Sequence, residues 1–371
     1  MSHSFESTYS GRRVLVTGHT GFKGTWLASW LIKLGAEVTG VSKGIPTSPS
    51  MFEDLGLSSK LNDIRLDVRD LDALADIVGE GKPDFIFHLA AQAIVSTSYT
   101  DPVETVTTNA IGSMNVLEAL RRTRLPSVAV MITSDKCYEN VEWEQGYRES
   151  DILGGKDVYS ASKAAAEIVI RSYVRSFFPA DGPARVVVGR AGNVIGGGDW
   201  STDRIVPDSV RAWGKNQKVS IRSPNATRPW QHVLEPLSGY LLLGQAARHD
   251  AKVHGEPFNF GPKDDQTQTV LELLKELSTH WGYESVDDSC VLGGDRSFHE
   301  ANLLRLNCEK ARSQLGWQPT LDYREAVGLV ADWYRAYQDK TDDMYEVTLR
   351  QIGEYEILSS ERNRNGGSDG R

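Results

Sequence analysis

The chain has 371 residues, which is long enough for one large domain or two lobes with a full hydrophobic core. Hydrophobic residues make up 40% and charged residues 25%, as in ordinary soluble globular proteins. The 41 basic and 50 acidic residues leave a formal charge of −9, which disfavours nucleic acid as the main partner but permits a locally basic site for an anion.

No apolar run is long enough to cross a bilayer, and the polar start does not resemble a signal peptide. Cys137, Cys290 and Cys308 show neither metal-binding spacing nor an even disulfide framework. We therefore expect a cytoplasmic protein with reduced thiols and no membrane contact. Residues 1–10 and 358–371 are polar and are predicted to be flexible tails.

The first strand is predicted over residues 13–17, and a glycine-rich turn with a helix-like segment follows it. Gly18, Gly21 and Gly24 lie in this turn in the spacing G-x-x-G-x-x-G. Glycine lets the backbone approach a pyrophosphate, and the N–H groups and dipole of a helix start favour the anion. The pattern indicates a dinucleotide site rather than a purely structural turn.

The second and third strands are predicted over residues 37–41 and 64–66. An acidic residue that binds the ribose is usual at the end of the second strand, but Ser42 and Lys43 stand there instead. An acid would repel a 2′-phosphate and Lys43 could accept one, so the strand end leaves NAD and NADP both open. Asp67 follows the third strand, where it either accepts a hydrogen bond from an adenine amino group or only ends the strand.

The fourth strand ends in Ala90 and Ala91, whose small size suits the close approach of a cofactor. His88 lies inside the same apolar run and is predicted to be a hydrogen-bonded core residue. A long helix over residues 105–122 carries Asn109. Strands and helices that alternate in this way predict an α/β fold with a doubly wound, right-handed parallel sheet of the Rossmann type.

An acid–base pair, Asp135 and Lys136, follows the fifth strand, and a phenol and an amine, Tyr159 and Lys163, come shortly after it. Residues four apart in a helix share one face. A free phenol titrates near pH ~10, and a nearby ammonium lowers that pKa. The spacing therefore suggests a general base with its tuning residue, although Y-x-x-x-K alone also fits two ordinary surface residues.

After a sixth strand over residues 185–190 the chain becomes rich in glycine. Arg222, Arg228 and Trp230 then follow within a short stretch. Arginines near aromatic rings could bind a diphosphate and stack a base. Solvated arginines are the equally acceptable alternative.

The blocks GHTGFKG, HLAAQ, TSD, YSASK and RAGNVIGGGDW together resemble the extended short-chain dehydrogenase/reductase family, and more narrowly its nucleotide-sugar 4,6-dehydratases. The resemblance covers roughly residues 11–340 and is greatest for the members that act on CDP-glucose. Members that act on dTDP-glucose carry Thr-Asp-Glu where this chain has Ser134-Asp135-Lys136. Epimerases of the fold lack the Asp-Lys pair.

The resemblance implies a redox-neutral conversion of CDP-D-glucose to CDP-4-keto-6-deoxy-D-glucose. Tyr159 would take the proton of the sugar 4-hydroxyl while the C4 hydride goes to NAD. Water would be lost across C5–C6, with Asp135 as the acid, and the hydride would return to C6. Lys136 would replace the family's glutamate as the base at C5, or would stabilise the enolate. A lysine acts as a base only when neutral, which requires burial or nearby positive charge.

The resemblance also implies the remaining sites and partners. NAD is expected at Gly18, Thr20, Gly21, Phe22, Lys23, Gly24, Ser42, Asp67, Val68, Ala90, Ala91, Gln92, Asn109, Thr133, Tyr159 and Lys163. The substrate is expected at Ser134, Asp135, Lys136, Asn193, Trp200, Arg204, Arg222, Arg228 and His299, and no metal is expected.

Two regions are expected, one that binds the cofactor and one that binds the substrate. The NAD-binding domain would comprise residues 11–190 with about 230–262, and a nucleotide-sugar lobe would comprise 191–229 and 263–345. A homodimer or homotetramer is expected through the helices at 105–122 and 159–178. Relatives supply deoxysugars for surface polysaccharide such as the lipopolysaccharide O-antigen.

Overall fold

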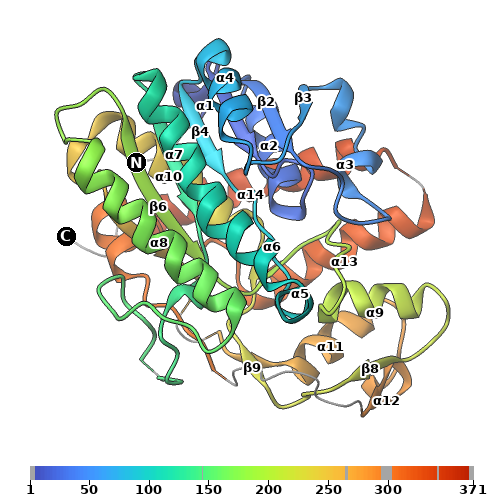
Figure 1. The fold of residues 1–371 in the computed structure, drawn as a ribbon. Coiled ribbons are helices and arrows are strands. Elements are labelled where there is room, and N and C mark those ends of the chain that lie inside the picture. The colour runs from blue at the N-terminus through green and yellow to red at the C-terminus, as the bar shows by residue number, and fades with distance from the viewer. Residues whose placement is uncertain (1–4, 144, 264–265, 294–302, 341, 367–371) are drawn as a thin grey trace.

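The computed structural model describes residues 5–143, 145–263, 266–293, 303–340 and 342–366. A seven-stranded parallel sheet forms its centre, in the order β11-β6-β5-β4-β1-β2-β3 (Figure 1). Its strands are rich in Val, Ile and Phe because both faces of a parallel sheet are covered. They are β1 (Arg13–Thr17), β2 (Glu37–Ser42), β3 (Asn62–Arg65), β4 (Phe85–His88), β5 (Val128–Ile132), β6 (Arg185–Ala191) and β11 (Pro257–Phe260).

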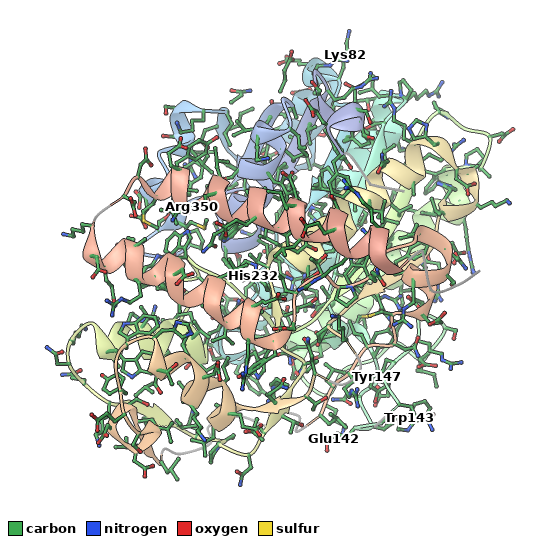
Figure 2. All side chains as sticks on the ribbon, turned by 180° about the vertical axis from the view of Figure 1, so that it is seen from behind. Lys82, Glu142, Trp143, Tyr147, His232 and Arg350 are labelled. Carbon is green, nitrogen blue, oxygen red and sulfur yellow. The ribbon has the colours of Figure 1, made fainter. Side chains whose placement is uncertain are left out.

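Helices cover both faces of the sheet, as the alternation of side chains along β1 illustrates. Leu15 faces a core formed with α4 (Leu71–Gly81), α7 (Gly112–Thr123) and α8 (Val158–Phe177). Val14 and Val16 face the opposite core, which includes α2 (Phe22–Lys33) and α10 (Leu234–His249). Two further helices, α13 (Tyr323–Asp339) and α14 (Met344–Gly366), lie outside this second layer. They lie in front in Figure 2, which shows the molecule from the side opposite to Figure 1. The predicted doubly wound parallel fold is confirmed.

The long helix predicted over residues 105–122 is present but widens in its middle. It consists of α6 (Pro102–Val106), a π-helical turn η2 (Thr107–Ile111) and α7. Such wide turns are common at functional sites. Here the turn contains Asn109.

A second group of elements lies beyond the carboxyl ends of the strands, at the bottom of Figure 1. It is built from short strand pairs rather than from a large sheet: β7 with β10, β9 with β12, and β8 with β13. The division into two functional domains stays a prediction. The elements of this group are β7 (Val194–Ile195), α9 (Ile205–Trp213), β8 (Val219–Ile221), β9 (Thr227–Arg228), β10 (Gln231–His232), β12 (Gln268–Thr269), α11 (Val270–Thr279), α12 (Val286–Ser289) and β13 (Cys290–Leu292).

Both ends of the described chain carry structure that the sequence interpretation missed. Helix α1 (Glu6–Tyr9) ends in a fully buried tyrosine, and the hydroxyl of Tyr9 donates to Leu241 O at 2.6 Å. Helix α14 extends to Gly366, where a flexible tail was expected from residue 358. Burial of Tyr9 holds the first stretch, and in the second Arg362 donates to the Glu325 carboxylate at 2.6 and 2.8 Å.

The remaining short segments connect the larger elements. They are α3 (Met51–Asp54), η1 (Leu57–Ser59), α5 (Val95–Thr100), η3 (Asp135–Cys137), η4 (Ala251–Val253) and η5 (Ala311–Leu315). Among the described residues, no helix combines the length and apolar character that a membrane span requires.

Candidate active site

A cavity of about 1360 Å³ opens at the carboxyl ends of the central strands and extends to the second group of elements. The crevice at this edge of a doubly wound sheet is the usual ligand position. Every predicted site residue that the structure describes lines the cavity, with the exception of Asn109. The predicted substrate residue at position 299 lies outside the described residues.

The glycine-rich turn forms a tight cradle at one end of this cavity. Gly18 has φ +78°, and a Cβ atom on it would lie 2.7 Å from the Ala90 nitrogen. A Cβ atom on Gly24 would lie 2.0 Å from the Gly18 oxygen. Helix α2 starts directly after Gly21, which has no side chain to cap the helix N–H groups. The cradle therefore fits the pyrophosphate of a dinucleotide.

His19, which was not predicted as a site residue, connects this turn to the neighbouring strands. Its Nδ1 is 3.0 Å from Ser42 Oγ and its Nε2 is 2.9 Å from Asp63 Oδ1. The imidazole occupies the space of a side chain at Gly40, where a Cβ atom would lie 2.3 Å from the ring. Burial lowers the pKa of His19. The Ser42 hydroxyl thus positions the glycine turn through His19 as well as lining the cavity.

Tyr159 and Lys163 occupy the first two turns of α8, beside the end of β5. Asp157 caps this helix by accepting a hydrogen bond from the Ser160 nitrogen at 2.9 Å. The Lys163 Nζ lies 6.0 Å from the centroid of the Tyr159 ring, and both side chains are buried. The structure therefore brings together the pair that the sequence spacing predicted.

The pKa of the Tyr159 phenol differs from the sequence-based expectation. Burial and the Asp135 carboxylate raise it to about 12, against the opposing effects of Arg204 and of a hydrogen bond with Ser134. Burial also lowers the pKa of Lys163 to about 8. The phenol pKa is therefore raised rather than lowered in the protein without ligands, because burial disfavours the charged form of both groups.

Asp135 and Lys136 lie in the short turn η3, directly after Ser134. The Ser134 hydroxyl donates to Asp135 Oδ1 at 2.8 Å. The other carboxylate oxygen occupies space left free by Gly192, where a Cβ atom would lie 2.1 Å from it. Lys136 is half-buried and lines the same cavity. A carboxyl group and an amine therefore line the same cavity as Tyr159.

Asn109 lies behind the cavity wall and does not line the cavity. Its Oδ1 accepts from the Gln92 nitrogen at 2.9 Å, and its Nδ2 donates to Ser162 Oγ at 2.8 Å. Ser162 Oγ in turn donates to the carbonyl of Tyr159 at 2.7 Å. The polar atoms of Asn109 hold α8 against the Gln92 segment, and its contact with the cofactor stays a prediction.

A buried ion pair beneath Lys163 was also missed from the sequence. Glu167 and Arg190 pair through contacts of 2.8 Å, with side chains only 4% and 3% exposed. Thr133 donates to Glu167 Oε1 at 2.5 Å, and Arg190 donates to the Tyr138 hydroxyl at 2.7 Å. This network holds α8 against β5 and β6. The hydroxyl of Thr133 is therefore occupied, although the residue still lines the cavity.

The opposite wall of the cavity carries predicted substrate residues together with acidic residues that pair with two of them. Arg204 pairs with Asp199 at 2.9 Å, and Arg222 pairs with Asp203 at 3.3 Å. Asp199 belongs to the glycine-rich block GGGDW, which was the sequence signal that could have identified it.

Unsatisfied donors mark the same wall of the cavity. The indole nitrogens of Trp200 and Trp230 are buried and have no hydrogen-bond partner among the described residues. Arg228 is buried beside them, and Asn193 is half-buried in the lining. Buried N–H donors normally have partners, and these two nitrogens have no accessible surface in the protein without ligands.

Lys23 projects from the first turn of α2 into the cavity. Burial, followed by the positive charges of Arg204 and Lys163, lowers its pKa to about 8, while Asp135 and Asp199 oppose this shift. Positive side chains are thus concentrated in a molecule with a net charge of −9. Such a cavity suits a ligand with phosphate groups.

A glycine cradle on a parallel sheet, together with Ser134, Tyr159 and Lys163 at its carboxyl edge, defines a dinucleotide-binding protein of the extended short-chain dehydrogenase/reductase class. The chain belongs to the GDP-mannose 4,6 dehydratase family, whose model matches residues 15–329.

Two relatives cover most of the chain. The sequence is 44% identical over 351 residues to the CDP-glucose 4,6-dehydratase of Salmonella typhimurium, covering 94% of this chain and 97% of that protein. It is 25% identical over 342 residues to a probable dTDP-glucose 4,6-dehydratase of Sinorhizobium fredii, covering 87% and 92% of the two chains.

Solved structures show the same fold. The dTDP-glucose 4,6-dehydratase of Streptomyces venezuelae, determined with NAD and TYD bound, has a TM-score of 0.76 at 22% identity and covers 90% of this chain and 99% of its own. The UDP-glucose 4-epimerase of Thermotoga maritima, determined with UDP-glucose, has a TM-score of 0.75 at 24% identity and covers 88% and 99%.

Proposed function

We propose that the protein is a CDP-D-glucose 4,6-dehydratase, a hydro-lyase that converts CDP-D-glucose to CDP-4-keto-6-deoxy-D-glucose. The observation that carries this proposal is the Asp135–Lys136 pair, which shares one cavity with Ser134 and Tyr159. Epimerisation needs no such pair. The 44% identity to the Salmonella typhimurium enzyme over nearly the full chain supports the same reaction and the same nucleotide.

NAD fits the end of the cavity that contains the glycine cradle. When bound it supplies a hydride acceptor that later serves as a hydride donor, so the reaction has no net redox change. Gly18, Gly21 and Gly24 would hold its pyrophosphate, and Lys163 would hold the nicotinamide ribose. The further residues that would hold it are Thr20, Phe22, Lys23, Ser42, Asp67, Val68, Ala90, Ala91, Gln92, Thr133 and Tyr159.

Tyr159 acts as the base for the sugar 4-hydroxyl. Its phenol must lose a proton although burial and Asp135 raise its pKa to about 12. Ser134 and Arg204 act in the opposite direction because both stabilise the phenolate. The strength of Tyr159 as a base is therefore set by neighbouring charges of both signs.

Asp135 and Lys136 carry the elimination. Lys136 in its neutral form removes the proton at C5, which the 4-keto group has acidified, and Asp135 in its protonated form gives a proton to the C6 oxygen. The C5–H and C6–O bonds break, a double bond forms between C5 and C6, and water leaves. The hydrogen bond from Ser134 holds Asp135 in position for this transfer.

The nucleotide diphosphate is held by the opposite wall of the cavity. Arg228 and Asn193 are the proposed diphosphate contacts, with Trp200, Arg204 and Arg222 around them. His299 remains a predicted contact outside the described residues.

The direct test is to incubate the protein with CDP-glucose and catalytic NAD, and to measure the 4-keto-6-deoxy product by its ultraviolet absorbance in alkali. Parallel reactions replace CDP-glucose by UDP-glucose or dTDP-glucose, and NAD by NADP. We expect product from CDP-glucose without net NADH. Stoichiometric NADH without product would instead identify a dehydrogenase and would leave Asp135 and Lys136 without the roles assigned here.

The protein is further proposed to form a homodimer or homotetramer through the helices at 105–122 and 159–178. Large apolar side chains are exposed there on the single chain, including Ile111 at 39%, Ile168 at 46% and Phe177 at 48%. Sedimentation of the wild type and of Ile168→Arg tests this surface. A wild type that sediments as a monomer would contradict it.

A cytoplasmic location is proposed because Cys137, Cys290 and Cys308 are free and buried, which suits a reducing compartment. Recovery of the protein outside the cytoplasmic fraction of its native cell would contradict this.

A further inference from the structure

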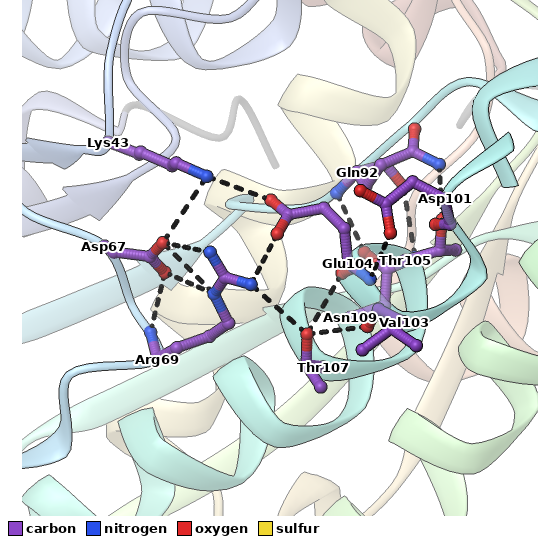
Figure 3. Close-up of polar contacts among 10 residues, drawn as sticks. All are labelled: Lys43, Asp67, Arg69, Gln92, Asp101, Val103, Glu104, Thr105, Thr107 and Asn109. Atoms are coloured by element: carbon purple, nitrogen blue, oxygen red, sulfur yellow. Dashed lines mark hydrogen bonds and ion pairs between the residues drawn. The ribbon is translucent and has the colours of Figure 1, made fainter.

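Four charged side chains meet where β2 and β3 end (Figure 3). Lys43 lies 3.7 Å from Asp67 and 3.2 Å from Glu104, measured between charged atoms. Arg69 contacts Asp67 at 2.6 Å and also pairs with Glu104. Asp67 and Arg69 follow β3, whereas Glu104 reaches the group from α6. The two cations and two carboxylates form a closed ring of ion pairs, which we call the charge quartet.

The charge quartet lies at the end of the cavity where the adenosine of a dinucleotide belongs. Lys43, Asp67 and Glu104 line the cavity, together with Ser42. The end of the second strand is where dinucleotide-binding sheets meet the ribose 2′-oxygen. In many NAD-binding proteins an acidic residue stands there, and in this chain none does.

The charges of the quartet cancel, which matters for a ligand that differs only by a 2′-phosphate. The side chains of Asp67 and Glu104 are 26% and 28% exposed and that of Lys43 is 63% exposed, and all three line the cavity, so a ligand can approach them. A 2′-phosphate at Lys43 would have to compete with two carboxylates for this cation. The displaced carboxylates would then repel it.

We propose that Glu104 is the residue that makes this site select NAD over NADP, by neutralising Lys43 and Arg69 from α6. It replaces, from another element, the acidic residue that is missing at the end of β2. The inference rests on the proposed function only in that the cavity binds a nicotinamide dinucleotide. Asp67 contributes the second carboxylate but is also the expected adenine contact, so Glu104 is the residue that tests the idea cleanly.

The test is direct titration of the full-length protein with NAD and with NADP, by calorimetry or protein fluorescence and without sugar substrate. Glu104→Gln keeps the shape of the side chain and the hydrogen bond that the backbone N–H of residue 104 donates to Asp101, but leaves the quartet with a net positive charge. We expect its affinity for NADP to rise about tenfold and its affinity for NAD to change by less than about twofold. Glu104→Lys should extend the gain, and Glu104→Gln combined with Lys43→Ala should lose most of it.

A control variant and the salt dependence of binding distinguish this proposal from a general effect of net charge. Glu256→Gln makes the same change in net charge at a residue that pairs with Lys310 at 2.6 Å outside the cavity lining, and it should leave both affinities unchanged. The NADP gain of Glu104→Gln should shrink as salt rises, because the pairs are partly exposed.

The inference is overturned if the ratio of NADP to NAD affinity in both Glu104 variants equals that of the wild type while NAD still binds. Failure of the wild type to bind NAD at all would overturn both this inference and the proposed function. An enzyme that binds NAD normally but makes no product from CDP-glucose would contradict the proposed function alone.

Discussion

The phenol of Tyr159 is surrounded by charges of both signs, and this balance sets its chemistry. Burial and Asp135 hold the proton on the phenol, while Arg204 and Ser134 favour its loss. Lys163 lies along the same helix face, but burial lowers its own pKa to about 8. At the scale of single residues, the site therefore depends on which neighbours each side chain contacts, and these come from three separate segments of the chain.

Replacement of Lys136 separates oxidation from elimination. Lys136→Ala should still oxidise the sugar, so NADH should accumulate on the enzyme, while release of product falls by about 100-fold or more because the C5 proton has no base. Stopped-flow absorbance of NADH together with product assay measures both steps. Lys136→Glu distinguishes the two roles: recovered activity indicates a base, and continued loss indicates electrostatic stabilisation. Near wild-type turnover of Lys136→Ala would contradict both.

Gly192 is expected to be essential for the position of the acid. The Cβ atom of Gly192→Ala would lie 2.1 Å from Asp135 Oδ2, so the carboxylate must move. We expect kcat to fall by about tenfold or more with a smaller change in KM, since a misplaced catalytic group affects chemistry more than binding. Gly353→Ala in α14 is the matched control, because nothing lies within 4 Å of its Cβ position. Equal kcat for the two variants would show that Asp135 tolerates the shift.

At the scale of elements, Glu235 joins α10 to the chain around residue 320 and to α14. It accepts hydrogen bonds from the nitrogens of Thr320 and Leu321 at 2.9 and 2.6 Å, and from the Tyr355 hydroxyl at 2.8 Å. Burial raises its pKa to about 7. A carboxyl group whose pKa is higher in the folded state adds stability at low pH, and this contribution is lost as the pH rises through the folded pKa.

Glu235 should therefore make its own contribution to the pH dependence of the free energy of unfolding. Relative to Glu235→Gln, the wild type should lose on the order of 2–3 kcal/mol between about pH 5 and pH 7, because only the wild type must ionise a buried carboxyl group. Urea unfolding of both proteins across this range gives the difference directly. A difference that stays flat with pH would show that Glu235 titrates normally.

The π-helical turn between α6 and α7 illustrates what an element contributes to the site. It places Asn109 where its side chain holds both the Gln92 segment and Ser162 on α8. A sequence pattern that predicts one long helix places the residue on the correct element. It does not show whether the side chain faces the cavity or another helix.

At the scale of the whole molecule, the cavity lies between the sheet and the second group of elements, so ligands should stabilise the fold from two sides. NAD and CDP, each added alone, should raise Tm by mass action. Arg228→Ala should remove most of the shift caused by CDP but leave the shift caused by NAD. Differential scanning fluorimetry measures Tm for the wild type and for Arg228→Ala, each with NAD and with CDP. A loss of both shifts would mean that the variant damages the fold rather than the nucleotide site.

The sequence by itself determined the order of strands and helices and the glycine cradle, and it singled out Asp135, Lys136, Tyr159 and Lys163 as candidates. These features depend on local spacing, which a linear pattern records: the period of apolar residues, glycines before a helix, and two side chains one helical turn apart. Family resemblance added Ser134 and the substrate residues of the opposite wall. It could place the segments that carry them, but not their partners.

Only the tertiary structure decided which charges meet. It showed that burial raises the phenol pKa, that Asn109 stands behind the wall, that Glu167 and Arg190 pair beneath Lys163, and that Glu104 meets Lys43 from a distant helix. Ion pairs and burial join residues far apart in the chain, and their energies depend on distance and dielectric environment. The distance between two side chains and the dielectric environment around them are fixed only when the chain has folded.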